Sequence, residues 1–273
     1  MAKLIFETHY PEIVDEAMLR DLLEQSPSGE ELLWNKRNQV WRIQAPDGET
    51  WAVKRFSTRF PKAFVYALRA GKARRSYLYA SAMQERGVNT PAPVAYAELR
   101  GPGNLLLGSL YISRYEPSEP LEALMPEGSE REYEMYAASH SRPRDPEWIP
   151  AALAEYAAGM HARGVVHNDF NVTNVRLPSP IPPLPTVSDF SLIDLNRAHI
   201  YPKGENPSLK ERFDDIVRFM PLDEAWLRFA RLYLRAARIP ESEMPLLLER
   251  KRRFDARKAR KRKFKSILRR RRG

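Results

Sequence analysis

The chain has 273 residues, of which 43% are hydrophobic, and it contains no cysteine. This length and composition allow one large or two modest domains with hydrophobic cores. The missing cysteines exclude disulfides, thiolate metal sites and cysteine nucleophiles. The start of the chain lacks the pattern of a secretory signal, and no run approaches the 18 apolar residues of a membrane span. The sequence therefore predicts a cytoplasmic protein.

The formal net charge of +10 is unevenly distributed. Residues 250–273 contain 15 Lys and Arg and a single acid, so this basic tail carries +14 and the first 249 residues carry −4. A helical tail would have a narrow apolar stripe made of Phe254, Phe264, Ile267 and Leu268. Such a basic helix is typical of proteins that lie on an anionic membrane surface. A nucleic-acid partner is disfavoured, because the tail has no Tyr or Trp for base stacking.

The first half of the chain is typical of an antiparallel sheet with one main helix. Residues 31–44 and 50–56 are rich in strand-forming residues, and an Asp-Gly turn signal separates them. Residues 61–86 have a helical pattern, which Gly87 ends. Residues 104–117 contain two short apolar runs split by Gly108, and these predict another pair of strands.

The second half is typical of a helical lobe with a small β insert. Residues 116–147 are rich in Pro, Glu and Ser, which indicates a linker with irregular helix. An amphipathic helix is predicted over Trp148–Ala162, with Gly164 as its stop. The sequence thus predicts an α+β fold with two lobes, a small β-rich N-terminal lobe over 1–112 and a mostly helical C-terminal lobe over 113–249.

Three separated segments carry residues suited to phosphoryl transfer. The segment GVVHNDFNVTN, residues 164–174, contains Asp169 and Asn174, whereas Lys54 lies inside the strand WAVKRF and Asp194 follows the strand SLI. Transfer from a nucleotide needs a carboxylate that orients and deprotonates the attacking hydroxyl. It also needs a carboxylate and an amide oxygen that hold Mg²⁺, and a lysine that neutralises the phosphates.

The same segments resemble a known family. HNDFNVTN matches the kinase catalytic-loop pattern H-x-D-x-x-x-x-N, and WAVK resembles the strand motif V-A-I-K. FSLIDLNR and GVNTPAPVAY are similar to segments of the lipopolysaccharide core kinases (Kdo/heptose kinase-like) of the protein-kinase-like superfamily, over about residues 30–200. The resemblance implies that Asp169 is the catalytic base, that Asn174 and Asp194 bind Mg²⁺, that Lys54 contacts the phosphates of ATP, and that His167 holds the loop by hydrogen bonds.

The sequence departs from the family pattern around the predicted lysine. The glutamate expected to pair with Lys54 lies in the family within S-Y-x-Y-A, where this chain has Leu78. Glu85 lies on roughly the same helix face but further along. Either another acid pairs with the lysine, or the lysine is held differently, or activity is reduced.

Two further features concern the nucleotide and the metal. The segment WNKRNQ has no glycine, so Lys36, Arg37 and Asn38 are the candidates to contact phosphate in place of a glycine-rich loop. Asp189 competes with Asp194 as the metal ligand, and we favour Asp194 because the strand over 190–193 leads into it. No A-P-E segment follows, which argues against a protein substrate.

We therefore predict an ATP- and Mg²⁺-dependent kinase that phosphorylates a sugar hydroxyl of the lipopolysaccharide core. Its acceptor would be a lipid-linked sugar, and the protein would be peripheral on the cytosolic face of the inner membrane. The alternatives are a pseudokinase that binds nucleotide or a partner without transfer, a small-molecule phosphotransferase, and an RNA-associated factor with a basic tail.

Overall fold

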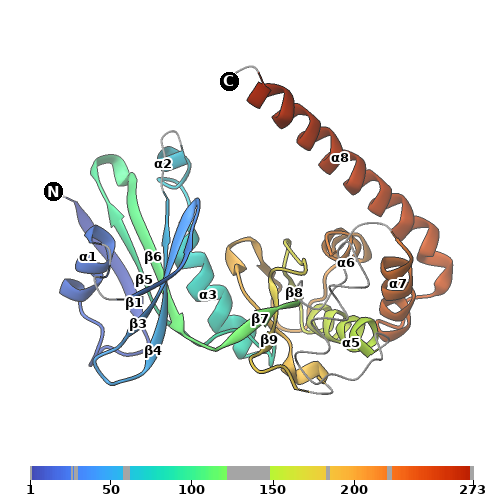
Figure 1. Ribbon diagram of the computed structural model, residues 1–273, viewed down its shortest axis with the longest axis horizontal. Helices are drawn as coiled ribbons and strands as arrows, with labels where there is room; N and C mark the ends of the chain where they lie inside the picture. The colour runs from blue at the N-terminus through green and yellow to red at the C-terminus, as the bar shows by residue number, and fades with distance from the viewer. Residues whose placement is uncertain are drawn as a thin grey trace. The chain divides into compact units, whose positions relative to one another are not determined.

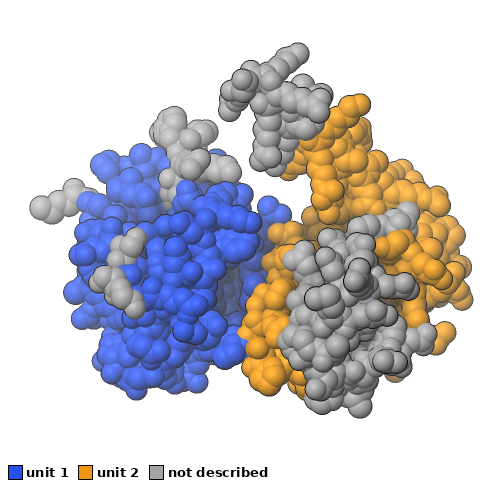
Figure 2. Space-filling model, in the orientation of Figure 1, with its two compact units in different colours: residues 1–117, 193–197 blue, residues 118–192, 198–273 orange. Residues whose placement is uncertain are grey.

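The computed structural model describes residues 2–25, 27, 30–57, 62–121, 148–182, 185–219 and 223–270. The chain forms two compact units, shown in different colours in Figure 2. Unit 1 contains residues 1–117 and 193–197, and unit 2 contains residues 118–192 and 198–273. Unit 1 is built on an antiparallel sheet and unit 2 is mainly helical, so the predicted α+β fold class is confirmed.

Unit 1 is a six-stranded antiparallel sheet with the strand order β1-β5-β6-β4-β3-β2. The strands are β1 (Lys3–Thr8), β2 (Glu31–Asn35), β3 (Asn38–Gln44), β4 (Thr50–Phe56), β5 (Pro93–Arg100) and β6 (Leu106–Arg114). The helices are α1 (Glu16–Glu24), α2 (Lys62–Val65), α3 (Lys72–Gln84) and the 3-10 turns η1 (Pro102–Asn104) and η4 (Leu195–Arg197). The sequence analysis assigned no element to the segment that forms β1 and α1.

Alternation along β4 separates the two faces of this sheet. Trp51 and Val53 are fully buried in a core that also takes Leu19 and Leu22 of α1. Phe56, on the other face, packs with α3 in a second cluster. Lys54 has the same parity as Phe56, so strand geometry places it on the side of the sheet that α3 covers.

The predicted turns and helix ends of unit 1 are largely confirmed. Gly48 occupies the Asp-Gly turn with φ +85°, a conformation that glycine adopts without steric cost. Gly87 ends the helical region with φ +66°, and the Val88 N–H donates to the Met83 carbonyl at 2.9 Å, which completes a helix C-cap.

Two predictions for unit 1 were wrong. The helical pattern over 61–86 forms two helices, because tertiary bonds use the carbonyls between them: Arg100 Nη1 donates to Tyr66 at 2.5 Å and Asn104 Nδ2 donates to Ala67 at 2.6 Å. Residues 106–114 form one strand rather than a strand pair split at Gly108. The ladder with β5 keeps this glycine extended, because Gly108 pairs with Leu99, and the ladder with β4 begins at the next residue, Ser109.

The described residues of unit 2 form four helices and two small sheets. The helices are α5 (Trp148–Ala162), α6 (Leu209–Ile216), α7 (Glu224–Ala236) and α8 (Met244–Arg270), with the 3-10 turns η3 (Val187–Asp189) and η5 (Glu241–Glu243). The sheets have the orders β10-β9-β7 and β11-β8, from β7 (Ser118–Pro120), β8 (Val165–Val166), β9 (Val175–Pro178), β10 (Ser191–Leu192) and β11 (His199–Ile200). In Figure 1, α5 and α7 run side by side, and the two helices pack together.

Helix α5 has the bounds that the sequence predicts, and Gly164 follows it with φ +70°. The predicted linker with irregular helix lies mostly outside the described residues. The predicted lobe boundary at residue 112 falls inside β6, whereas unit 1 continues to Pro117. No helix in the described part of the chain is long and apolar enough to cross a membrane.

Candidate functional site

Lys54 lies in the centre of the unit 1 sheet, where β4 pairs with β3 and β6. It is opposite Val40 on one side and Tyr111 on the other. Its ammonium is 5.4 Å from the centre of the Phe56 ring. The side chain is 21% exposed, so strand pairing fixes the lysine backbone while its charged end still reaches solvent.

Asp194 is the acid that pairs with Lys54. Lys54 Nζ donates to Asp194 Oδ1 at 2.7 Å, although the two residues are 140 positions apart in the chain. The Asn196 amide donates to the same oxygen at 2.6 Å. Residues 193–197 form part of unit 1, and η4 within them packs against α3. The structure therefore brings two predicted site residues into direct contact.

The backbone of Asp194 supports a functional role for this residue. Its φ is +62°, in the left-handed region that non-glycine residues rarely occupy. Such a conformation costs of the order of 1–3 kcal/mol, and it is found most often at functional sites. Here the two hydrogen bonds to Oδ1 help to hold the carboxylate in place.

The question raised by Leu78 is answered by these contacts. Leu78 lies in α3 and is 39% exposed. Glu85 is the exposed C-cap residue of the same helix. Of the three possibilities left open by the sequence, the structure shows the first: another acid, Asp194, pairs with Lys54.

The three candidate phosphate contacts lie at the turn between β2 and β3. The Lys36 N–H donates to the Asn38 carbonyl at 3.2 Å, and the Lys36 ammonium lies 4.3 Å from the centre of the Trp34 ring. Arg37 is exposed. Asn38 begins β3, which is the strand next to β4, so the turn and Lys54 belong to neighbouring strands of one sheet. Trp34, which is 50% exposed, was not predicted to belong to the site.

Asp169 and Asn174 belong to unit 2, in the loop between β8 and β9. The Asn174 amide nitrogen donates to the Asp169 carbonyl at 2.9 Å, and the Asn171 amide donates to the same carbonyl at 2.8 Å. The Asn171 oxygen in turn accepts the Thr173 N–H at 3.0 Å. Asn168 has φ +60°. These bonds tie the predicted base, Asp169, and the predicted metal ligand, Asn174, into one compact loop.

A buried aspartate that the sequence analysis did not single out supports this loop. Asp215 of α6 is fully buried, and its Oδ2 accepts the backbone N–H of His167 at 2.8 Å. The same oxygen lies 3.3 Å from His161 Nε2, and His161 Nδ1 lies 2.7 Å from the Tyr233 hydroxyl. His161 is therefore a packed residue, fully buried in unit 2.

Electrostatics favour the charged form of this aspartate. Burial by itself would raise the pKa of Asp215, but the hydrogen bonds and charges of His161 and His167 hold its pKa below the ordinary value. A charged carboxylate beneath the loop orients the His167 backbone, which precedes Asp169 by two residues. A weak signal in the sequence was the pair of acids, Asp214 and Asp215, between the apolar residues Phe213 and Ile216.

Asp189, the competing metal candidate, has a local structural role. Its carboxylate accepts the Thr186 N–H at 2.6 Å and the Thr186 hydroxyl at 2.8 Å, forming a capping box at η3. Lys54 and Asn196 both donate to Asp194. The geometry thus separates a capping carboxylate at residue 189 from an ion-paired one at residue 194.

The residues described fit the chemistry of a nucleotide and Mg²⁺. Carboxylate and amide oxygens, as in Asp194 and Asn174, are the ligands that Mg²⁺ prefers in proteins. A lysine already facing a carboxylate at 2.7 Å is placed to face anionic oxygens. Among the described residues there is no group of three or more His, Cys, Asp or Glu that could hold a metal ion by itself.

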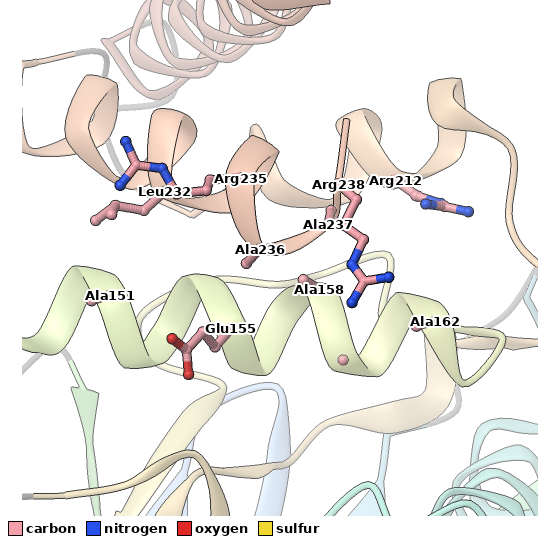
Figure 3. A pocket seen from close by; sticks show the side chains of 11 residues that line it. Ala151, Glu155, Ala158, Ala162, Arg212, Leu232, Arg235, Ala236, Ala237 and Arg238 are labelled. Carbon is pink, nitrogen blue, oxygen red and sulfur yellow. The ribbon is translucent and has the colours of Figure 1, made fainter. Parts of the chain in front are cut away.

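A groove of about 730 Å³ in unit 2 contains none of these residues. It runs between the small residues of α5, such as Ala158 and Ala162, and the end of α7, as Figure 3 shows. Arg212, Arg235 and Arg238 line it together with Glu155. The groove and the candidate catalytic loop thus have no residue in common.

Comparison with known proteins shows the family and the fold of the chain. The model of the "Lipopolysaccharide kinase (Kdo/WaaP) family" matches residues 23–218. Among solved structures, the fold is similar to that of WaaP in complex with acyl carrier protein, with a TM-score of 0.59 and 23% identity over 93% of this chain and 98% of that chain. The BubR1 kinase domain matches with a TM-score of 0.37 and 16% identity over 66% and 52% of the two chains. No curated protein sequence matches the chain.

Proposed function

The chain belongs to the lipopolysaccharide kinase (Kdo/WaaP) family, and from this premise we propose that it transfers the γ-phosphoryl group of ATP to a sugar hydroxyl of the lipopolysaccharide core. The acceptor would be a lipid-linked sugar, and the reaction would take place at the cytosolic face of the inner membrane. The observation that carries the proposal is the contact between Lys54 and Asp194, which unites two distant motifs in one unit.

The residues of the chain divide the work as follows. Lys54 neutralises charge on the phosphates, and Lys36, Arg37 and Asn38 bind them from the adjacent turn. Asp194 and Asn174 supply oxygen ligands, and the bound Mg²⁺ would stabilise the negative charge that develops on the phosphate oxygens. The roles of these six residues remain predictions.

Asp169 is the proposed general base. The acceptor hydroxyl oxygen forms a bond to the γ-phosphorus, the bond from that phosphorus to the bridging oxygen of ADP breaks, and the hydroxyl proton moves to the Asp169 carboxylate. The loop bonds from Asn171 and Asn174 to the Asp169 carbonyl support this role, because they fix the backbone that carries the carboxylate.

A set of isosteric variants tests the assignment. We expect Asp169→Asn and Asp194→Asn each to lower kcat for phosphate transfer to purified core lipopolysaccharide by at least about 100-fold, because each removes a charge used in the reaction. Asp189→Asn is the matched control and should keep activity within about threefold, because it alters only a capping box at an exposed turn. Transfer by Asp169→Asn at the wild-type rate would refute the assignment of the base.

The rival functions give different results in the same preparation. A pseudokinase would bind ATP without turnover, and a small-molecule phosphotransferase would phosphorylate soluble alcohols in preference to the core. The family match favours the lipopolysaccharide acceptor over the second rival. Mass spectrometry of lipid A–core from cells with and without the protein identifies the acceptor directly. The core from the deletion strain should lack one phosphate that the wild-type core carries.

A further inference from the structure

Helix α8 consists of a root, Met244–Asp255, and an arm, residues 256–270. Leu247 and Lys251 of the root are fully buried. Lys251 Nζ donates to the Val217 carbonyl at 3.1 Å and to Asp255 Oδ1 at 3.0 Å. Its ammonium also lies 5.4 Å from the centre of the Trp226 ring in α7. The root is therefore fastened to the helical core of unit 2.

The arm is a basic helix whose described side chains are exposed to solvent. Every residue from Ala256 to Phe264 is exposed, and six of these nine are Lys or Arg with no acid among them. In Figure 1 the helix extends well beyond α6 and α7 of the same unit. The arm of 15 residues is about 22 Å long at the α-helical rise. Like charges four residues apart destabilise such a helix, and an anionic surface would relieve their repulsion.

A small pocket lies between the root and α6. It has a volume of about 140 Å³ and is lined by Asp214, Val217, Arg218, Arg250, Arg253, Phe254 and Arg257. Four arginines and one acid thus line the pocket, and Arg253 also pairs with Glu249 outside it. Arg250 Nη1 pairs with Asp214 at 2.6 Å, whereas the buried Nε of Arg250 has no hydrogen-bond partner among the described residues. A buried, unpaired donor among arginines indicates a place for an anionic oxygen.

The structure also changes the predicted apolar stripe of the tail. Phe254 belongs to the root, where its ring lies 5.5 Å from the Arg218 guanidinium and 5.8 Å from the Lys251 ammonium. Phe264 of the arm is 63% exposed. The side chains of Ile267 and Leu268 lie outside the described residues. Charge rather than an apolar face is therefore the main property that the described arm offers to a partner.

We propose that the arm and the arginine pocket at its root form one docking surface for an anionic lipid bilayer. This rests on the proposed function, because a lipid-linked acceptor places the substrate in such a bilayer. A flat anionic surface matches a straight helix with basic residues around its circumference. The arm carries a single aromatic side chain, Phe264, to stack on bases, which makes RNA the less suitable polyanion. Because the root is packed into unit 2, binding of the arm to the bilayer would also hold unit 2 at the membrane.

Vesicle flotation of the full-length protein tests the proposal. The vesicles contain phosphatidylcholine with or without phosphatidylglycerol. The variant Lys258→Gln/Lys261→Gln/Arg262→Gln should reduce partition onto the anionic vesicles about 100-fold, at about 1 kcal/mol for each basic residue. Arg253→Gln in the pocket should reduce it about fivefold. The matched control Lys203→Gln/Lys210→Gln/Arg231→Gln removes the same charge from exposed residues elsewhere in unit 2 and should retain partition within about twofold.

Three outcomes would overturn the proposal. They are equal partition of the wild type onto neutral and anionic vesicles, equal losses in the two triple variants, and tighter binding to single-stranded RNA than to anionic vesicles at the same salt. Phosphate transfer to lipid-free core oligosaccharide separates this result from the proposed function. The arm variant should keep that activity, whereas a wild-type protein that transfers no phosphate refutes the kinase assignment and leaves the flotation result to decide the docking surface.

Discussion

The two units hold their candidate functional residues in different ways. In unit 1, Lys54 and Asp194 form an ion pair in which the side chains are 21% and 32% exposed. In unit 2, the loop with Asp169 rests on Asp215, which is completely buried beneath it. A partly exposed pair contributes little to stability and can exchange partners, whereas a buried charge with several hydrogen bonds fixes its surroundings.

This difference fits the two tasks proposed for the residues. A lysine that contacts phosphates must exchange its carboxylate partner for phosphate oxygens when a nucleotide binds. A general base must instead stay in one geometry, because small displacements of reacting groups lower the rate strongly. Unit 1 thus holds a lysine that can exchange its anionic partner, and unit 2 holds the loop of Asp169 in one backbone geometry.

The largest effect should come from the buried carboxylate. Asp215→Ala should lower the free energy of unfolding by about 3 kcal/mol or more, because it leaves the His167 N–H and the His161 ring without their buried partner. Urea denaturation followed by circular dichroism measures the loss. Asp214→Ala, one position earlier in α6, is the control. The Asp214 side chain, which pairs with Arg250, is 44% exposed, so its loss should lower the free energy of unfolding by less than about 1 kcal/mol. Equal losses would remove the distinction between the two units.

At the partly exposed pair of Lys54 and Asp194, we expect a large effect on activity and a small effect on stability. Lys54→Met should reduce phosphate transfer by about 100-fold or more while the free energy of unfolding changes by less than about 1 kcal/mol. Lys72→Met is a matched control, because it also removes an ammonium that lies over the Phe56 ring, at 5.8 Å, but Lys72 is outside the predicted site. A large loss of stability in Lys54→Met would show that the ion pair is structural.

The smallest effect is a pH dependence of stability. The pKa of Asp215 is held below its ordinary value in the folded protein, so its contribution is complete above that ordinary value, about pH 4, and is lost as the pH falls through the lower folded pKa. The difference in unfolding free energy between the wild type and Asp215→Asn should therefore be constant from about pH 5 to 7 and shrink below about pH 4. Denaturation series at these pH values measure it. A difference that grows on acidification would contradict the depressed pKa.

Local patterns in the sequence predicted much of the fold. Helix α5 has the expected bounds because its apolar spacing and its terminal glycine act within one segment. The break between α2 and α3 was not predictable in this way, since it depends on Arg100 and Asn104, which lie more than 30 residues further along. The continuous β6 likewise depends on ladders with two other strands.

The sequence by itself determined the family, the order of the motifs and the candidate residue types at Lys54, Asp169, Asn174 and Asp194. Only the tertiary structure decided which acid faces Lys54, which aspartate supports the catalytic loop, and that the root of the basic tail is packed while its arm is exposed. The reason is physical: periodicity and turn signals act over a few residues, whereas an ion pair or a buried hydrogen bond depends on which distant segments the core brings together.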